Sequence, residues 1–178
     1  MEQGDTDLTA RARRYALGDG PGTAARCRTL AGAAVGDWYG PLSPARRTAA
    51  GDLLLVVTEL VADAVRHGGT PYELRLDRAG DRVWVQLSDT GPVRARPHGR
   101  HRPARPDGHG LYLVERLAAA WGCVPRDRGR TVWCAIPFPL GPGERSGPSR
   151  PSEPPPGGWP PGGSPRHPAR GQDRRRRP

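Results

Sequence analysis

The stretch Asp52-Leu-Leu-Leu-Val-Val-Thr-Glu59-Leu-Val-Ala-Asp63-Ala-Val-Arg-His67-Gly-Gly69 predicts a long amphipathic helix with a sharp end. Ser43 can cap the start of this helix, Pro44 takes the favoured first position, and the two final glycines end it, which gives a helix over residues 45–67. At about 100° per residue, one face is apolar and packs on a core: Leu53, Leu54, Val57, Leu60, Val61, Ala64 and Val65. The opposite face is predicted to be polar, with Asp52, Glu59, Asp63 and Arg66.

Shorter patterns surround this helix in the sequence. A strand around residues 13–17 and a helix over 23–38, with Thr23 as its N-cap, are predicted to precede it. Residues 72–77 and 82–88 each alternate apolar and polar side chains, which predicts a β-hairpin with one buried side.

The last part of the domain is predicted to be a helix and a second hairpin. Core spacing indicates a helix over 110–121, closed by Gly122, and residues 122–125 and 131–138 are the expected strands. The order of elements predicts an α+β fold: a two-layer sandwich of a mostly antiparallel mixed sheet with helices on one face.

Composition separates this domain, residues 8–139, from the two ends of the chain. The 39 residues 140–178 contain 11 Pro and 8 Gly and very few aliphatic side chains. Such a segment buries too little apolar surface to offset chain entropy, so we expect a disordered tail. Residues 1–7 are polar and are expected to be a flexible N-terminus.

Several classes of protein are excluded or disfavoured by composition. The apolar stretches are shorter than the roughly 18–20 residues that span a bilayer, and the N-terminus lacks the pattern of a secretory signal, so we expect a cytoplasmic protein without a membrane partner. All 28 basic residues are Arg, which removes a P-loop lysine. Cys27, Cys123 and Cys134 lack the spacing of a zinc site or a disulfide framework and are expected to be buried thiols.

Two carboxylates on the long helix can carry chemistry. Glu59 and Asp63 are four residues apart, so both point the same way. One can bind Mg²⁺ held by phosphates while the other accepts a proton from an attacking hydroxyl. The alternative is a solvated helix face on which Arg66 and His67 are local partners.

Two further stretches have the chemistry of a nucleotide site. In Ser88-Asp-Thr-Gly-Pro92, a carboxylate at a strand end can accept a hydrogen bond from an exocyclic amine, although the same residues are common in turns. In Asp107-Gly-His-Gly-Leu111, paired glycines before a helix can expose backbone N–H groups to phosphate. The Arg-rich residues 93–107 between them are a candidate lid or binding loop.

These stretches, in this order, resemble the nucleotide-binding boxes of the GHKL ATPase superfamily. The narrower resemblance is to anti-sigma regulatory factors with serine/threonine kinase activity. It spans about residues 8–138 and rests on four motifs: Glu59-Leu-Val-Ala-Asp63-Ala-Val-Arg66-His67-Gly68-Gly69, Asp89-Thr-Gly-Pro92, Gly108-His-Gly-Leu111-Tyr-Leu-Val114 and Thr131-Val-Trp133.

The resemblance implies an ATP site that uses Mg²⁺ and a histidine-kinase-like ATPase fold. Glu59 matches the general base, Asp89 the acceptor for the adenine amine, and Thr131 a strand threonine near the adenine. Asp63 stands where the family has an Asn that binds the metal. The resemblance implies that the remaining ATP-site residues are Arg66, His67, Gly91, Gly108, His109, Gly110 and Leu111, with residues 94–105 as the lid.

Three functions remain open at this point. The resemblance implies a partner switch in which the protein phosphorylates a serine of an antagonist protein and sequesters a sigma factor, and it allows a homodimer. The second reading is a module of the same fold that binds ATP, or nothing, and acts only through protein contacts. The third is a basic nucleic-acid binder that uses the Arg-rich loop and residues 174–177, which lack interleaved aromatic side chains for base stacking.

Overall fold

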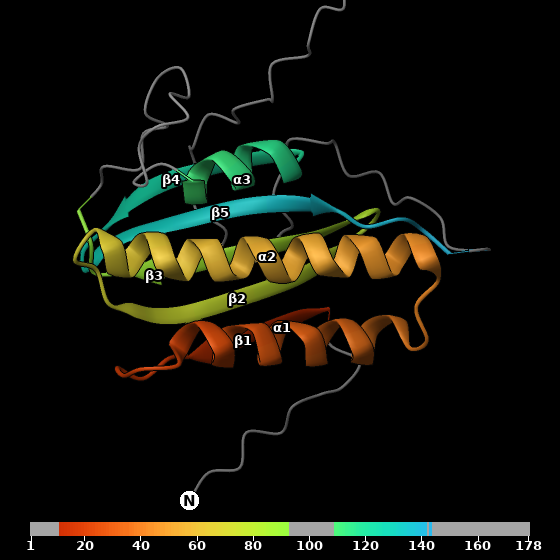
Figure 1. Ribbon diagram of the computed structural model, residues 1–178, viewed down its shortest axis with the longest axis horizontal. Coiled ribbons are helices and arrows are strands. Elements are labelled where there is room, and N and C mark those ends of the chain that lie inside the picture. The colour runs from red at the N-terminus through yellow and green to blue at the C-terminus, as the bar shows by residue number, and fades with distance from the viewer. Residues whose placement is uncertain (1–10, 93–108, 142, 144–178) are drawn as a thin grey trace, which may run out of the picture.

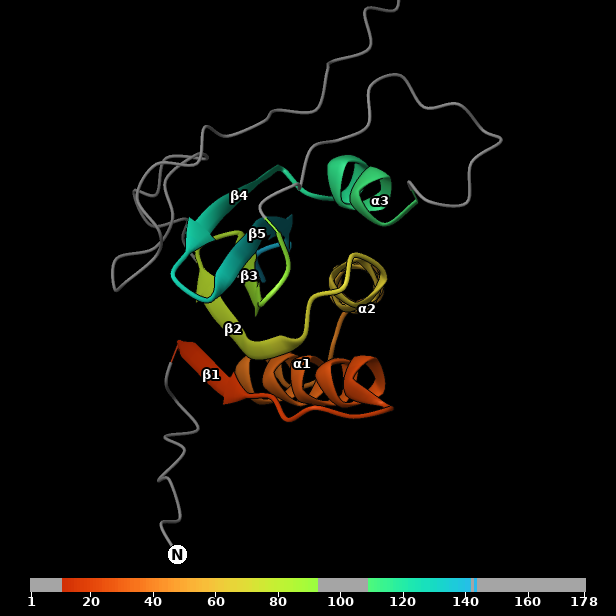
Figure 2. The ribbon, with the colours of Figure 1, turned by 90° about the vertical axis from the view of Figure 1, so that its left-hand side faces the viewer.

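The computed structural model describes residues 11–92, 109–141 and 143. The elements follow in the order β1 (Ala12–Ala16), α1 (Thr23–Tyr39), α2 (Pro44–Arg66), β2 (Pro71–Ala79), β3 (Arg82–Asp89), α3 (His109–Leu117), β4 (Ala120–Arg126) and β5 (Gly129–Pro137). The five strands form one sheet in the order β1-β2-β3-β5-β4, and the three helices lie on one of its faces (Figures 1 and 2). The two-layer α+β sandwich predicted from the sequence is confirmed, with every pair of neighbouring strands antiparallel instead of the expected mixture. Residues 1–7 and the tail beyond residues 140, 141 and 143 lie outside the described part, so the expectations for them stay predictions.

Helix α2 lies between α1 and α3 and carries much of the core (Figure 1). Its N-terminus forms as the sequence predicts, because the Ser43 side chain accepts a hydrogen bond from the backbone N–H of Arg46 at 3.4 Å and Pro44 opens the helix. The buried apolar side chains of α2 pack against the sheet and against α1 and α3: Leu53, Val56, Val57, Leu60, Val61 and Ala64. Two assignments to the faces of this helix were wrong, since Val65 is 60% exposed and Asp63 is buried.

The ends of the other two helices differ from the prediction. Gly22, with φ of 92°, is the N-cap of α1, while the Thr23 hydroxyl donates to the carbonyl of Gly20 at 2.9 Å. Helix α3 ends at Leu117, four residues before the predicted end, and Trp121 belongs to β4. Gly122 is also a strand residue, and a Cβ there would lie 2.8 Å from the Trp133 indole. The apolar spacing of α3 continues into the buried strand β4, so periodicity alone did not separate them.

The register between β3 and β5 decides which side chains face the helices. Asp89 is opposite Arg130 and Ser88 is opposite Thr131. Side chains alternate along a strand, and Leu87 and Val132 belong to the core under the helices, whereas Trp84 and Trp133 form a second cluster with Ala120 and Ala135 on the other face. Asp89 and Arg130 therefore face the helices, and Ser88 and Thr131 face away.

Two of the three cysteines are confirmed as buried thiols. Burial raises the pKa of Cys27 to about 11 and raises the pKa of Cys134 further, because a thiolate is poorly solvated in the core. Cys123 is half-buried. All three are free cysteines, and the prediction of a buried thiol is wrong for Cys123.

Within residues 11–92, 109–141 and 143, no helix combines the length and the apolar character needed to cross a lipid bilayer.

Candidate functional site

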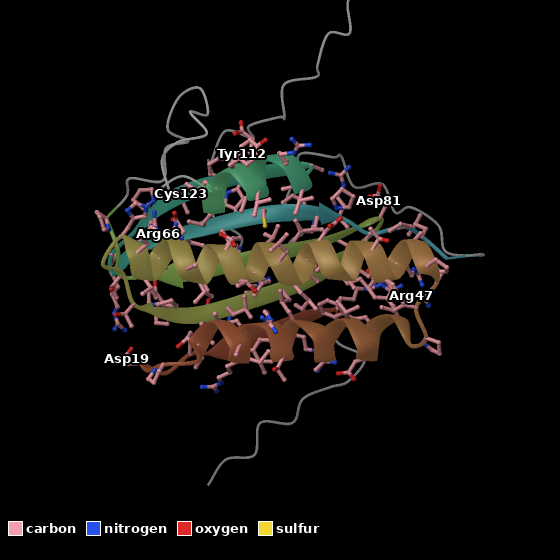
Figure 3. The ribbon with its side chains drawn as sticks, viewed as in Figure 1. Asp19, Arg47, Arg66, Asp81, Tyr112 and Cys123 are labelled. Atoms are coloured by element: carbon pink, nitrogen blue, oxygen red, sulfur yellow. The ribbon has the colours of Figure 1, made fainter. Side chains whose placement is uncertain are left out.

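Three elements that are distant in the sequence meet near the C-terminal end of α2, where Arg66 is labelled in Figure 3. Asp63 comes from the last turn of α2, Asp89 is the final residue of β3, and Arg130 is the second residue of β5. The Arg130 guanidinium donates from Nη2 to Asp63 Oδ2 at 3.0 Å and from Nε to Asp89 Oδ2 at 3.0 Å and Oδ1 at 3.2 Å. The structure thus joins two predicted site carboxylates through an arginine that the sequence analysis did not select.

This set of charges is almost completely removed from water. The side chains of Arg130 and Asp89 are 1% and 0% exposed, and that of Asp63 is 6% exposed. Isolated buried charges are costly, whereas charges that are paired and hydrogen-bonded can be accommodated. The three side chains therefore depend on one another, and we refer to Asp63, Asp89 and Arg130 as the carboxylate–arginine triad.

Asp89 lies in a close-fitting backbone cradle. Its Oδ1 accepts a hydrogen bond from the backbone N–H of Gly91 at 2.7 Å. A Cβ at Gly69 would lie 2.5 Å from the same oxygen, and a Cβ at Gly91 would lie 2.6 Å from it. Glycine is required at both positions because backbone approaches the carboxylate so closely. The role of Gly91 as an ATP-site residue stays a prediction, because its neighbour in the structure is Asp89 itself.

Asp63 also contacts its own helix. The Nε2 atom of His67, one helical turn further on, lies 3.3 Å from Asp63 Oδ1. Each carboxylate oxygen of Asp63 thus has a nitrogen partner, His67 for Oδ1 and Arg130 for Oδ2. The alternative from the sequence, a solvated helix face with local partners, is correct in making His67 a partner of Asp63. It is wrong about the solvation of Asp63, because β5 brings an arginine against that face of α2. Arg66 is exposed.

The two carboxylates of α2 occupy different surroundings. Glu59 is half-buried and lies one turn before Asp63. Asp63 is directed at β5 and is held there by Arg130. Their i, i+4 spacing places them on the same side of the helix, yet only Asp63 belongs to the triad.

Thr131 is not brought into this cluster. Its Oγ1 lies 2.9 Å from Ser88 Oγ and accepts a hydrogen bond from Arg126 Nε at 3.2 Å, both on the sheet face turned away from the helices. The strand residue that faces Asp89 is Arg130, one position earlier. The register of β5 against β3 places Arg130, and not Thr131, opposite Asp89, and the spacing within the motif did not reveal that register.

The residues predicted to hold phosphates lie at the start of α3. His109 and Gly110 are the first two residues of this helix, and Leu111 is half-buried against the core. Gly108 and the Arg-rich residues 93–107, the predicted lid, lie outside the described residues. Their roles at a phosphate site stay predictions.

The chemistry of the triad does not fit a metal ion. Asp89 is an acceptor at a strand end within a glycine cradle, but its side chain is 0% exposed and both of its oxygens accept hydrogen bonds from Arg130, so an adenine amine reaches it only after Arg130 moves. Mg²⁺ needs free oxygen ligands, but both Asp63 oxygens already have nitrogen partners. Among the described residues, no group of three or more His, Cys, Asp or Glu side chains could hold a metal ion. The arrangement therefore does not fit Mg²⁺ at Asp63.

The two-layer sandwich with a long central helix is the fold that the resemblance to the GHKL ATPases implies. The sequence profile of the histidine kinase-like ATPase domain matches residues 21–136, and the chain belongs to this family. Membership implies ATP binding, usually with Mg²⁺. A comparison with curated proteins gives no match.

Proposed function

We propose that this protein is an ATP-binding regulator of the anti-sigma type, which acts in the cytoplasm and changes its contacts with a sigma factor and an antagonist protein. The observation that carries the proposal is the position of Asp89, buried at the end of β3 between Gly69 and Gly91. Family membership and the order of the sequence motifs support the same function.

Calorimetric titration of the full chain with ATP tests the nucleotide site. Asp89→Asn replaces one acceptor oxygen by an amide and is expected to lose ATP binding. Asp77→Asn is the matched control, because Asp77 is also a buried aspartate beside an arginine but lies on the other face of the sheet. Equal ATP affinity in both variants would contradict the assignment of Asp89 to adenine.

We also propose that the protein transfers phosphate to a serine of its antagonist. The support is Glu59, which matches the general base in the resemblance and is half-buried, one turn before Asp63. A general base must lie within hydrogen-bond reach of the hydroxyl that it deprotonates. Glu59→Gln is therefore expected to abolish phosphate transfer from labelled ATP to a co-purified antagonist while ATP binding survives.

Glu73→Gln is the control for this experiment. Glu73 is a partly exposed carboxylate on β2, paired with Arg14 at 3.6 Å, and lies on the sheet face away from the triad. It should leave transfer unchanged. Loss of transfer in both variants, or in neither, would contradict a general-base role for Glu59.

A second candidate function is supported by the triad itself. Phosphoryl transfer generally depends on a metal ion that neutralises developing charge on the phosphates, and Asp63 is paired with Arg130 instead. The protein would then bind ATP and regulate its partners by contact alone. Wild-type protein that binds ATP, binds a sigma factor and phosphorylates no co-purified partner would support this function over the kinase.

A further inference from the structure

Arg130 bridges the two site carboxylates, Asp63 and Asp89. Its Nε and Nη2 atoms lie 3.0 Å from Asp89 Oδ2 and 3.0 Å from Asp63 Oδ2, respectively. A planar guanidinium presents several donors in a fixed geometry, so it can bridge two carboxylates that belong to different elements. One side chain of β5 thereby links α2 to β3 at the candidate nucleotide site.

The charge balance of the site follows from this bridge. Asp63 and Asp89 together contribute two negative charges, and Arg130 returns one positive charge between them. His67 Nε2 adjoins the remaining oxygen of Asp63 at 3.3 Å. A divalent ion at Asp63 would have to displace a buried, permanently charged guanidinium or lie beside it, and like charges at contact distance repel strongly where water is excluded.

We infer that Arg130 is an internal counter-ion that takes the place of a divalent cation at Asp63, so that this chain binds nucleotide without Mg²⁺. Only the claim of nucleotide binding without Mg²⁺ rests on the proposed ATP site; the role of Arg130 as a counter-ion does not. Arg130 is a positioning residue, since it contacts the two carboxylates and holds Asp89 in the orientation that its glycine cradle surrounds.

The claim that Arg130 replaces a cation is tested by Mn²⁺ binding to the full chain in the absence of nucleotide. Electron paramagnetic resonance measures the free Mn²⁺ that remains. Wild-type protein is expected to bind no Mn²⁺. In Arg130→Gln the two carboxylates lose their counter-ion, and we expect this variant to bind Mn²⁺. Arg75→Gln is the matched control, because Arg75 is a buried arginine 3.7 Å from Asp77 on the opposite face, and it should behave as wild-type.

The outcomes separate cleanly. Mn²⁺ binding by wild-type protein, or a folded Arg130→Gln variant that binds no more Mn²⁺ than Arg75→Gln, would overturn the inference. Circular dichroism reports whether Arg130→Gln is folded. Arg130→Lys, which retains one positive charge but has only a single ammonium for two carboxylates, is the second variant and is expected to bind Mn²⁺ more weakly than Arg130→Gln.

ATP titrations of wild-type protein with Mg²⁺ and with EDTA test the claim that nucleotide binds without Mg²⁺. We expect similar affinities in the two buffers, and a loss of about tenfold or more in EDTA, equal to about 1.4 kcal/mol, would overturn it. Absence of ATP binding in both buffers would refute the proposed function and with it the claim of magnesium-free binding. The Mn²⁺ experiments would still decide whether Arg130 replaces a cation.

Discussion

Two buried arginine–aspartate contacts lie on opposite faces of the same sheet, and they differ in what they connect. Arg75 and Asp77 belong to one strand, β2, two residues apart, with Nη2 and Oδ2 separated by 3.7 Å. Arg130 joins residues 67 and 41 positions away, on α2 and β3, at 3.0 Å each. The first contact is local to a strand, whereas the second exists only when three elements are assembled.

Burial of an ion pair therefore does not by itself mark a functional site. The Arg75–Asp77 contact lies beside Gln86 and Trp84 in the strand register, on the sheet face turned away from the helices. The triad lies where the predicted nucleotide motifs converge, and removal of its arginine leaves two carboxylates without their cation. We expect the two contacts to contribute differently to the free energy of unfolding, because one joins neighbouring residues and the other joins three elements.

The largest effect is expected from removal of the shared cation. Arg130→Gln should lower the free energy of unfolding by about 3–5 kcal/mol, because it leaves buried charge uncompensated. Arg75→Gln should cost less, about 1–3 kcal/mol, because its contact with Asp77 is longer, at 3.7 Å. Urea denaturation followed by circular dichroism measures both. Equal losses would show that connectivity does not distinguish the two contacts.

The glycine cradle should be the next most sensitive feature. A Cβ at Gly69 would lie 2.5 Å from Asp89 Oδ1 and 2.8 Å from the backbone nitrogen of Gly91, so Gly69→Ala should cost about 1–3 kcal/mol through overpacking. Gly51, on α2, has no heavy atom within 4 Å of an added Cβ. Gly51→Ala should stabilise the protein by up to about 1 kcal/mol through helix propensity. Thermal unfolding measures the stability of both variants. An unchanged melting temperature in Gly69→Ala would contradict the close fit of backbone around Asp89.

A smaller loss is expected when charge is removed and shape is kept. Asp63→Asn retains one oxygen that can accept from Arg130 but loses the charge-assisted part of the contact, and we expect a cost of about 1 kcal/mol. Because this change also makes the triad more positive, Mn²⁺ binding should remain absent. Chemical denaturation and the Mn²⁺ assay together check this prediction, and a loss as large as that of Arg130→Gln would contradict it.

The smallest effect should come from the opposite face. Thr131→Val removes the hydroxyl that bonds to Ser88 and Arg126, at a cost of about 1 kcal/mol, the typical net contribution of one hydrogen bond. ATP affinity should be unchanged, because Thr131 faces away from Asp89. A clear drop in ATP affinity would restore Thr131 to the nucleotide site.

Local signals in the sequence predicted most of the fold correctly. Ser43 and Pro44 mark the start of α2, and the alternation of residues 72–77 and 82–88 marks the first hairpin. The errors lie where local signals overlap. The apolar spacing of α3 continues into β4, and Thr23 follows a glycine that takes the N-cap position.

The candidate site was predicted only in part, for a related reason. Asp63 and Asp89 are visible in motifs, but their contact depends on the packing of α2 against the sheet and on the register of β5. A shift of one residue in that register would exchange Arg130 and Thr131 between the two faces. Sequence spacing within one motif carries no information about that register.

Local sequence was sufficient to predict the types of most elements, much of the apolar face of α2 and the carboxylate at the end of β3, because these depend on side chains within one turn or a few strand residues of each other. Long-range packing set the burial of Asp63, the direction of Thr131 away from Asp89 and the position of Arg130 between the two aspartates. Those facts depend on contacts across 41 and 67 residues, where strand register and helix packing, not local preference, select the neighbour of each charge.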